Sequence, residues 1–350
     1  MNDLDKRLQL KKKFKNWAVD PNISINNKLN IEQSSSDITA EFKANYFKNS
    51  QVIDMTGGFG IDTYFFSQSS DEIIYIEENI ELFEAVMWNF KYLEVKNVSF
   101  INMDSIKYLS SLRSRVNLIY CDPSRRNDGK KVFKLEDSEP NITLIFDKIE
   151  GLTDKFLLKT SPFLDIKYVQ NQLPNINEIL LVSVDGELKE ILYYFDFKNP
   201  DIVSYTAVLL KNNKSQLIKF CNLATTIQYS YPKLYIYEPD SSIMKLGFFA
   251  EFASKFNLEK LEVNSHLFTS DALIEDFPGR RFQLEDIVKP DAKFLRKNLI
   301  DGKANLTIRN FPDTVASLKI KLKIKDGGNK YLFATRLIDK KYRILICEKI

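Results

Sequence analysis

The residues best suited to chemistry in this sequence form a glycine-rich turn, D-M-T-G-G-F-G at 54–60, which follows a short apolar segment. Glycine lets the backbone pass close to a ligand without a Cβ clash, and the start of the following helix offers free N–H groups. A dinucleotide site would require the spacing G-x-G-x-x-G, but Thr63 stands where the last glycine belongs. The spacing therefore favours S-adenosylmethionine, whose positively charged amino-acid end suits the carboxylate of Asp54.

Two later apolar segments also end in polar side chains. Glu77 follows 72–76, where a carboxylate can accept hydrogen bonds from both hydroxyls of a ribose, although it can also serve only as the acidic start of a helix. Asp104 follows 98–101, from which a side chain can reach an adenine amino group. The cofactor-binding residues that we predict are Asp54, Thr56, Gly57, Gly58, Gly60, Glu77, Asn79, Asp104 and Ser105.

A fourth apolar segment, 116–121, runs into the motif D-P-S-R-R at 122–126. With this motif, residues 50–215 resemble the class I S-adenosylmethionine-dependent methyltransferases, which have D-x-x-G-G-x-G, an acidic strand end, a short Asp motif and D-P-x-x in the same order. Members that methylate exocyclic amino groups carry [DN]-P-P-[YFWR], and its carboxylate or amide accepts a hydrogen bond from the target amine. The resemblance implies that Asp122 has this role.

The motif departs from the family pattern at two positions. Ser124 replaces the second proline, and Arg125 stands where an aromatic residue is usual. A guanidinium plane can stack on a base, and two adjacent arginines can bind a phosphate, but the arginines can also be plain surface charge. Cys121 precedes the motif, and we expect it to be a small buried residue, which disfavours covalent methylation. The predicted catalytic residues are Asp122, Pro123, Ser124, Arg125 and Arg126.

Further motifs narrow the resemblance to bacterial class I methyltransferases with a C-terminal THUMP-like domain. They include Gln33–Ser36 with Thr39, Ala40, Lys43 and Ala44, then Leu135–Asp137, Glu139-Pro140, Tyr237–Asp240, Asp276–Arg280, Arg309–Pro312 and Lys325–Gly328. The likeness spans nearly the whole chain. THUMP domains of better-known enzymes bind RNA, so the resemblance implies an RNA partner, of the tRNA or rRNA type, by analogy.

The charge distribution is uneven along the chain. The 350 residues carry a formal charge of +3, but residues 280–350 contain 18 Lys and Arg against 8 Asp and Glu, which is +10 and leaves −7 for the rest. Within this basic region, four lysines alternate with apolar residues before a D-G-G turn at 326–328 and the segment 330–336. This pattern predicts a β-hairpin with lysines on one face, about 6.6–6.8 Å apart. The lysines would contact RNA or only protect a sheet edge. The predicted RNA-binding residues are Lys319, Lys321, Lys323, Lys325, Arg309 and Arg336.

The elements that must position these residues alternate between short apolar segments and helix-length segments. Strands are predicted at 51–55, 72–76, 98–101, 116–121, 155–159, 178–184 and 204–211, and helices at 4–17, from 38 and at 78–93. This alternation indicates an α/β fold with a largely parallel sheet, which we assign as a Rossmann-like methyltransferase sheet with an N-terminal helical segment and a small C-terminal α+β, THUMP-like domain. The predicted domains are an N-terminal helical segment at 1–50, a methyltransferase domain at 51–228, a small connecting α+β region of ferredoxin-like character at 229–279 and a basic THUMP-like domain at 280–350.

The composition excludes several other classes of protein. No apolar run approaches the ~18 residues needed to span a bilayer, and the N-terminus lacks the apolar region of a signal peptide. Three distant cysteines and one histidine, His266, disfavour a disulfide framework or a metal site, so we expect no metal, no role for His266 and a cytoplasmic location. The predicted function is S-adenosylmethionine-dependent methylation of a base amine in structured RNA. The alternative is an RNA-binding protein with a non-catalytic methyltransferase fold, and an NAD-dependent oxidoreductase is disfavoured by the missing glycine.

Overall fold

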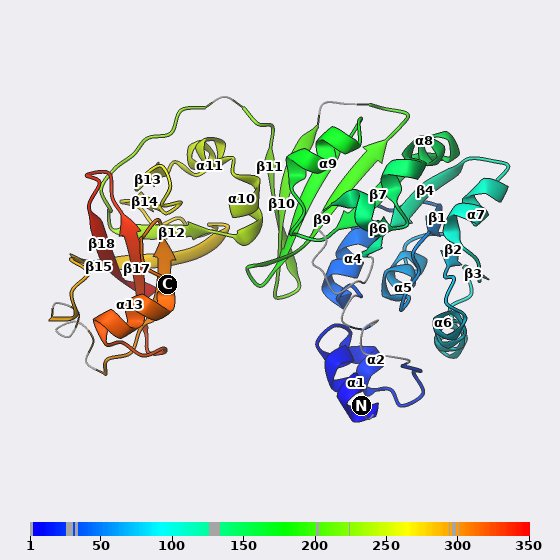
Figure 1. Ribbon diagram of the computed structural model, residues 1–350, viewed down its shortest axis with the longest axis horizontal. Coiled ribbons are helices and arrows are strands. Elements are labelled where there is room, and N and C mark those ends of the chain that lie inside the picture. Colours follow the sequence, from blue (N-terminus) through cyan, green and yellow to red (C-terminus); the bar gives the residue numbers. More distant parts are fainter. Residues whose placement is uncertain are drawn as a thin grey trace. The chain divides into compact units, whose positions relative to one another are not determined.

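The computed structural model describes residues 3–25, 31, 34–125, 134–200, 203–223, 225–293, 295, 299 and 301–350 (Figure 1). The chain forms two compact units. The first unit comprises Met1–Val184, Lys189–Thr206 and Leu210–Ser215, and the second comprises Asp185–Leu188, Ala207–Leu209 and Gln216–Ile350.

Among the described residues, nine strands form the first sheet, in the order β11-β10-β8-β9-β7-β4-β1-β2-β3. Neighbours from β3 to β7 pair in parallel, and β9 is antiparallel to β7. The strands are β1 (Gln51–Asp54), β2 (Glu72–Ile76), β3 (Val98–Ile101), β4 (Val116–Cys121), β7 (Thr153–Thr160), β8 (Glu178–Val184), β9 (Glu187–Asp196), β10 (Ser204–Lys211) and β11 (Lys214–Phe220). All seven predicted strands are present, and the α/β prediction is confirmed.

Sequence reasoning missed β9 and β11. The start of β9, E-L-K-E, carries three charged residues and hides the strand pattern. A turn signal was nevertheless present, because β8 and β9 are joined by only Asp185 and Gly186, which have φ values of 51° and 86°. An Asp-Gly pair with both residues at positive φ is typical of a two-residue hairpin turn.

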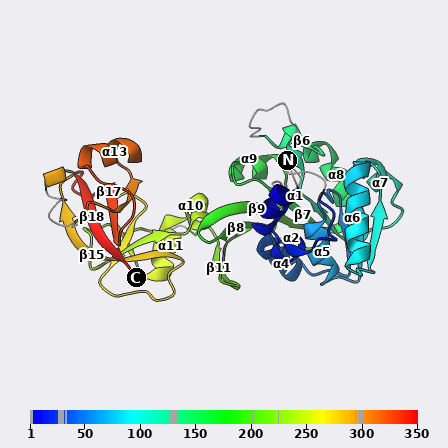
Figure 2. The ribbon, with the colours of Figure 1, turned by 90° about the horizontal axis from the view of Figure 1, so that it is seen from below.

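Helices cover both faces of this sheet. Figure 2 shows α8 and α9 on one side and α4 and α5 on the other. The predicted helix start after the serines is confirmed, because the Ser36 side chain accepts a hydrogen bond from the backbone N of Thr39. The helices are α1 (Asp3–Lys11), α2 (Lys15–Val19), α4 (Asp37–Tyr46), α5 (Ile61–Ser67), α6 (Ile80–Tyr92), α7 (Ser105–Ser111), α8 (Ile142–Leu152) and α9 (Ile166–Gln172), with a 3₁₀ turn at Leu135–Asp137 and a two-stranded pair, β5 (Ser124–Arg125) and β6 (Ser138–Glu139).

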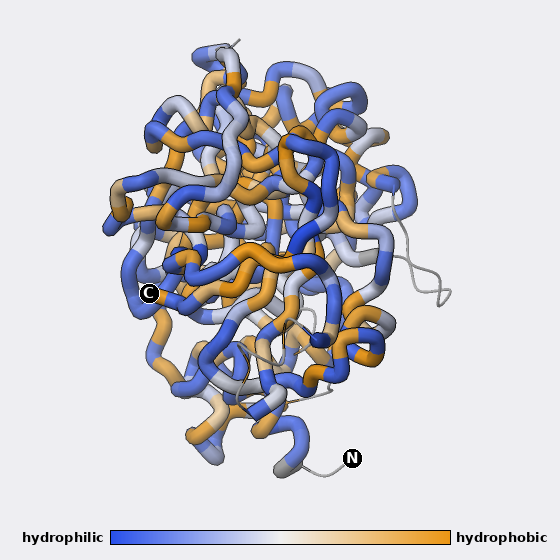
Figure 3. The backbone as a smooth tube through the Cα atoms, turned by 90° about the vertical axis from the view of Figure 1, so that its left-hand side faces the viewer, coloured by the Kyte–Doolittle hydropathy of each residue, from blue (hydrophilic) through white to orange (hydrophobic). Residues whose placement is uncertain are grey.

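The N-terminal segment packs into the core of the first unit. The Trp17 ring lies 5.7 Å from the ring of Phe59, which is part of the glycine-rich turn, and 6.2 Å from the ring of Phe90 on α6. Leu10 and Phe14 belong to the same buried cluster. Hydrophobic and hydrophilic stretches alternate along the chain (Figure 3). Residues before 50 are therefore part of the same core as the sheet.

A second sheet organises the second unit, with the order β13-β14-β12-β15-β18-β17-β16 among the described residues. Because β12 pairs antiparallel with β15, the regions 229–279 and 280–350 contribute to one sheet. The division of the chain at residues 50, 228 and 279 remains a prediction. The elements are β12 (Tyr235–Pro239), α10 (Ser241–Leu246), α11 (Phe249–Phe256), β13 (Glu259–Lys260), β14 (Phe268–Ser270), β15 (Gly279–Val288), β16 (Asn305–Arg309), α13 (Val315–Leu322), β17 (Lys330–Arg336) and β18 (Tyr342–Lys349).

The predicted lysine-faced hairpin is wrong. Residues 315–322 form helix α13, and β17 pairs instead with β16 and β18. The Thr314 side chain caps this helix by accepting a hydrogen bond from the backbone N of Ser317. Leu318 and Leu322 are buried together, as an i,i+4 pair on one helix face can be. The alternation of lysines with apolar residues therefore fits a helix as well as a strand, because it places Leu318 and Leu322 four positions apart.

The positions of Ile320 and Leu322 provide a test of this helix. In a strand the two side chains would share one face, whereas in α13 Ile320 is 79% exposed and Leu322 only 2%. We expect Leu322→Ala to lower the free energy of unfolding by roughly 2–5 kcal/mol. Ile320→Ala, the matched control, should change it by less than about 0.5 kcal/mol.

Urea denaturation followed by circular dichroism measures both variants. The fluorescence of the two tryptophans, Trp17 and Trp88, reports separately on the first unit, which contains them both. Equal losses in the two variants would contradict the helix.

Candidate active site

Asp54 anchors the glycine-rich turn through two hydrogen bonds. Its side chain is buried, with 1% of the residue exposed. Oδ1 accepts a hydrogen bond from the backbone N of Thr56 (3.0 Å), and Oδ2 accepts one from Oγ1 of Thr63 on α5 (2.6 Å). Burial raises the pKa of Asp54 to about 7, although the hydrogen bond from Thr63 acts in the opposite direction. Asp54 thus fastens the turn to the helix, and its predicted attraction for the amino-acid end of a cofactor remains a prediction.

Gly57 and Gly58 lack a side chain for two different structural reasons. A Cβ at Gly57 would lie 2.2 Å from the Tyr75 ring, so close packing excludes a side chain there. Gly58 has φ +53°, and its Cβ would meet only the carbonyl oxygen of Thr56, at 3.6 Å. The backbone at Gly58 therefore borders open space, as a ligand-binding turn requires. Gly60 is the N-cap of α5.

The structure brings Glu77 to this open position. Its Oε2 accepts a hydrogen bond from the backbone N of Gly58 (3.1 Å), and its Oε1 accepts one from the backbone N of Asn79 (2.9 Å). Burial raises the pKa of the Glu77 carboxyl, although the residue stays partly exposed. The hydroxyl of Tyr75, on strand β2 just before Glu77, donates to the carbonyl of Gly58 (2.7 Å) and so also holds the turn in place. The Asn79 side chain caps α6 by accepting from the backbone N of Leu82, so its contact with a cofactor stays a prediction.

The loop after β3 is tied to the loop after β2. Nδ2 of Asn102 donates to the carbonyl oxygens of Glu77 (2.8 Å) and Glu78 (3.1 Å). Asp104 is the N-cap of α7, where Oδ1 accepts from the backbone N of Lys107 (2.8 Å), and Ser105 begins that helix. The three predicted cofactor loops thus lie along one edge of the sheet. Asn102, which sequence reasoning did not select, holds two of them together.

The D-P-S-R-R motif adjoins the glycine-rich turn through one hydrogen bond. The backbone N of Asp122 donates to Oγ1 of Thr56 (2.7 Å). The carboxylate of Asp122 forms an ion pair with Lys159, near the end of β7. Ser124 is in the short strand β5, where its Oγ donates to the carbonyl of Glu139 (3.4 Å). Pro123 is partly exposed. Of Arg125 the structure describes the backbone alone, and Arg126 lies outside the described residues.

A buried network of charges interacts with Lys159, the partner of Asp122. Lys43 on α4 is fully buried, and its Nζ contacts Oε1 of Glu190 (2.9 Å) and Oδ1 of Asp62 (3.1 Å). Oδ2 of Asp62 accepts from Oγ of Ser35 (2.7 Å) and from the hydroxyl of Tyr120 (2.8 Å). Burial acts to raise the pKa of Asp62, but the nearby lysines outweigh it and lower that pKa. The sequence signal for this network was the N-terminal motif that supports the family resemblance, because it contains both Ser35 and Lys43.

Arg309 and Arg336 each have a partner within the chain, and their contact with RNA remains a prediction. Nη2 of Arg309 forms an ion pair with Oε1 of Glu238 (2.7 Å), a buried residue that also binds Arg280. Nε of Arg336 donates to the carbonyl of Lys340 (3.3 Å). Arg309 therefore helps to hold the second sheet together, as part of an ion-pair cluster centred on Glu238.

The four predicted lysines do not form a row on a strand. Lys319 and Lys321 lie on α13 and form ion pairs with Asp326 (2.5 Å) and Asp313 (2.6 Å). Lys323 ends the helix with φ +55°. Lys325 follows in an isolated bridge to Lys303. The region keeps its positive charge, but the regular spacing predicted for RNA contact is absent from these four residues.

Two residues set aside by sequence reasoning are buried or packed. Cys121 is fully buried, as expected, and burial raises the pKa of its thiol. The His266 ring stacks on Phe249 with centroids 4.3 Å apart. Burial, followed by the charges of Lys260 and Arg309, lowers the pKa of His266 to about 4. This histidine is therefore neutral near pH 7.

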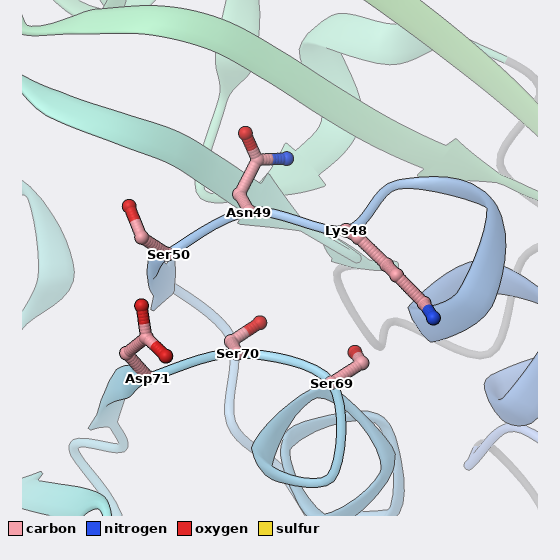
Figure 4. Close-up of a pocket in the computed structure, with 6 residues that line it drawn as sticks. All are labelled: Lys48, Asn49, Ser50, Ser69, Ser70 and Asp71. Atoms are coloured by element: carbon pink, nitrogen blue, oxygen red, sulfur yellow. The ribbon is translucent and has the colours of Figure 1, made fainter.

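A polar pocket of about 270 Å³ lies at the other edge of the first sheet. Figure 4 shows its lining side chains on the two loops that precede β1 and β2. They are Lys48, Asn49, Ser50, Ser69, Ser70 and Asp71. None of the predicted site residues is among them, so we place no reaction there. Within the described residues, no group of three or more His, Cys, Asp and Glu could hold a metal ion, and no helix could cross a membrane.

The raised pKa of Asp54 predicts a pH-dependent contribution to stability. Its folded-state pKa of about 7 exceeds the ordinary value of 3.8, so the folded protein holds this proton more tightly than the unfolded chain. The contribution is complete below about pH 4 and is lost as the pH rises through 7, by up to about 1.4 kcal/mol per pH unit.

Asp54→Asn lacks the titrating proton, so the free energy of unfolding of this variant should fall less between pH 4 and 7 than that of the unchanged protein. Urea denaturation followed by tryptophan fluorescence at several pH values measures the difference. Parallel pH profiles for the two proteins would contradict the burial-raised pKa.

Comparison with known families identifies both parts of the second unit. Residues 235–278 match a ferredoxin-like domain, and residues 279–349 match a THUMP domain-like family. An uncharacterised RNA methyltransferase from Mycoplasma mobile is 28% identical over 87 residues, which is 25% of this chain and 24% of that protein. The chain therefore spans about a quarter of the length of this relative.

A solved structure matches almost the whole chain. It is that of a presumed methyltransferase from Porphyromonas gingivalis W83, which is 30% identical and superposes with a TM-score of 0.89. The match covers 99% of this chain and 88% of the other. Because this match spans nearly the whole chain at 30% identity and residues 279–349 match the THUMP domain-like family, the chain belongs to the family of class I methyltransferases that carry a C-terminal THUMP-like domain.

Proposed function

We propose that this methyltransferase uses S-adenosylmethionine and methylates an exocyclic base amine of a structured RNA. The hydrogen bond between Asp122 and Thr56 carries the proposal. Thr56 lies in the glycine-rich turn, so this 2.7 Å contact joins the motif expected to bind the acceptor to the turn expected to bind the cofactor. Methyl transfer requires its two reactants to be held next to each other in this way.

The groups at the turn and in the two neighbouring loops suit the cofactor. The open backbone at Gly58 accommodates its methionine end, Glu77 accepts hydrogen bonds from the ribose hydroxyls, and the loop of Asp104 lies near the adenine. Glu77 already accepts two backbone hydrogen bonds, but each carboxylate oxygen has a second lone pair for a hydroxyl. When bound, the cofactor supplies an electrophilic methyl group.

Asp122 acts on the acceptor. Its carboxylate accepts a hydrogen bond from the amine and orients the nitrogen lone pair toward the methyl group. The nitrogen forms its new bond to the methyl carbon as the bond from that carbon to sulfur breaks, and the nitrogen then releases a proton to solvent. Catalysis in this proposal comes mainly from proximity and alignment.

Three observations support RNA as the acceptor. The THUMP-like match covers 279–349, residues 280–350 carry a formal charge of +10, and the Mycoplasma mobile relative is named an RNA methyltransferase. A positively charged domain attracts the phosphate backbone regardless of sequence. Because the four lysines do not form a row, we assign the RNA contact to the charge of the domain as a whole.

Cofactor binding is tested by titrating the protein with S-adenosylhomocysteine in a calorimeter. We expect binding to the unchanged protein, no binding to Gly58→Asp because its side chain fills the open space, and at least about tenfold weaker binding to Glu77→Gln because a hydroxyl acceptor is lost. Glu78→Gln alters the exposed neighbour of Glu77 and should bind as the unchanged protein does. An absence of binding to the unchanged protein would overturn the proposal.

The acceptor is tested with tritiated S-adenosylmethionine and total RNA from a strain that lacks this gene. We expect label to enter this RNA and not RNA from the parent strain, which is already methylated. Equal labelling of the two RNAs would exclude RNA as the acceptor. Binding of both S-adenosylhomocysteine and RNA without any transfer of label would instead support the non-catalytic alternative.

A further inference from the structure

Lys159 and Asp122 are neighbours at the carboxyl ends of adjacent strands. Cys121 of β4 pairs in parallel with Leu158 of β7, so the next residue of each chain segment continues the same register. Nζ of Lys159 donates to Oδ2 of Asp122. The Lys159 side chain is 10% exposed and that of Asp122 is 29% exposed. The lysine therefore supports the carboxylate from the interior, while Asp122 remains accessible to an acceptor.

Asp122 is held at two points by different elements. Its backbone N is bonded to Thr56 in the glycine-rich turn, and its Oδ2 is bonded to Lys159 on β7. The first contact fixes where the residue lies, and the second fixes how the carboxylate is turned. With Oδ2 engaged by the ammonium group, Oδ1 is the oxygen that can be presented to an amine.

Lys159 is itself a firmly held cation. Burial acts to lower its pKa, but the carboxylates of Asp122, Glu190 and Asp62 outweigh burial and raise that pKa above its ordinary value. Glu190 and Asp62 are in turn joined by the buried Lys43. The charges therefore alternate from the acceptor motif through the sheet to helix α4, and this arrangement leaves Lys159 little freedom to move away from Asp122.

We propose that Lys159 is a positioning residue for methyl transfer, which turns Asp122 so that its Oδ1 meets the acceptor amine. This inference rests on the proposed function, because it needs an amine acceptor at Asp122. Lys159 touches neither reactant in this proposal and acts through Asp122 alone.

The test uses the full chain with Lys159→Met, Lys159→Arg, Asp122→Ala and the double variant Lys159→Met/Asp122→Ala. Lys155→Met is the matched control, because Lys155 lies on the same strand and instead donates to Oδ1 of Asn49 (3.3 Å). Each protein is titrated with S-adenosylhomocysteine, which verifies folding and the cofactor site without activity. Turnover is then measured with RNA from the strain that lacks this gene.

We expect every variant to bind S-adenosylhomocysteine within about twofold of the unchanged protein. Lys159→Met should lower kcat by about 100-fold, the scale of a misplaced reacting group, with KM for S-adenosylmethionine unchanged. Lys155→Met should keep full turnover. In the Asp122→Ala background, Lys159→Met should cause no further loss, because its partner is already absent.

Two results would overturn the inference. One is normal turnover by Lys159→Met, and the other is a full multiplicative loss in the double variant, which would mean that Lys159 acts independently of Asp122. If Lys159→Met does not fold, Lys159→Arg takes its place, since it keeps the charge but changes the position of the donors. An unchanged protein that transfers no methyl group to RNA would instead refute the proposed function itself.

Discussion

The parallel pairing of β1 with β2 and β4 is the constraint on which the site depends. The carboxyl ends of parallel strands meet at one edge of a sheet, so Asp54, Glu77 and Asp122 arrive there from separate stretches of sequence. The loops then bind one another directly. Glu77 accepts a hydrogen bond from Gly58, and Asp122 donates one to Thr56. The turn at 56–58 is thus the common partner of the loops that carry Glu77 and Asp122.

The N-terminal segment contributes charge as well as hydrophobic packing to this edge. Placing an ammonium group such as that of Lys43 in the interior is costly unless carboxylates compensate it. Here Glu190 and Asp62 do so at 2.9 and 3.1 Å. Buried ion pairs of this kind add little to stability over apolar packing, but they are sensitive to geometry. Glu190 and Asp62 also interact electrostatically with Lys159, the partner of Asp122, which is consistent with a role in defining the site rather than in strengthening the fold.

Sequence reasoning was most accurate where a local pattern determines structure. The strands before Asp54, Glu77 and Asp122 were recognised because each is apolar and is followed by a turn or a helix signal. Lys159 was not recognised, because its pairing with Asp122 joins residues 37 positions apart on different strands. Nothing in the local sequence of β7 distinguishes it from another strand lysine.

The error at 315–325 has a different origin. The alternation L-K-I-K-L-K-I-K satisfies the period of a strand, yet it also places Leu318 and Leu322 one helical turn apart. The tertiary context decides between the two, because β17 already has β16 and β18 as partners. The sequence pattern alone could not distinguish a helix from a strand at 315–325, because the apolar residues fit the period of both.

The pairing of β12 with β15 also affects how this chain can be inherited. The ferredoxin-like match ends at residue 278 and the THUMP-like match begins at 279, yet Tyr237 of one lies opposite Arg281 of the other where β12 and β15 pair. A gene fusion or deletion at this junction would leave unpaired backbone groups on both sides, a ready template for aggregation. We therefore expect the two segments to be inherited together, as a single unit.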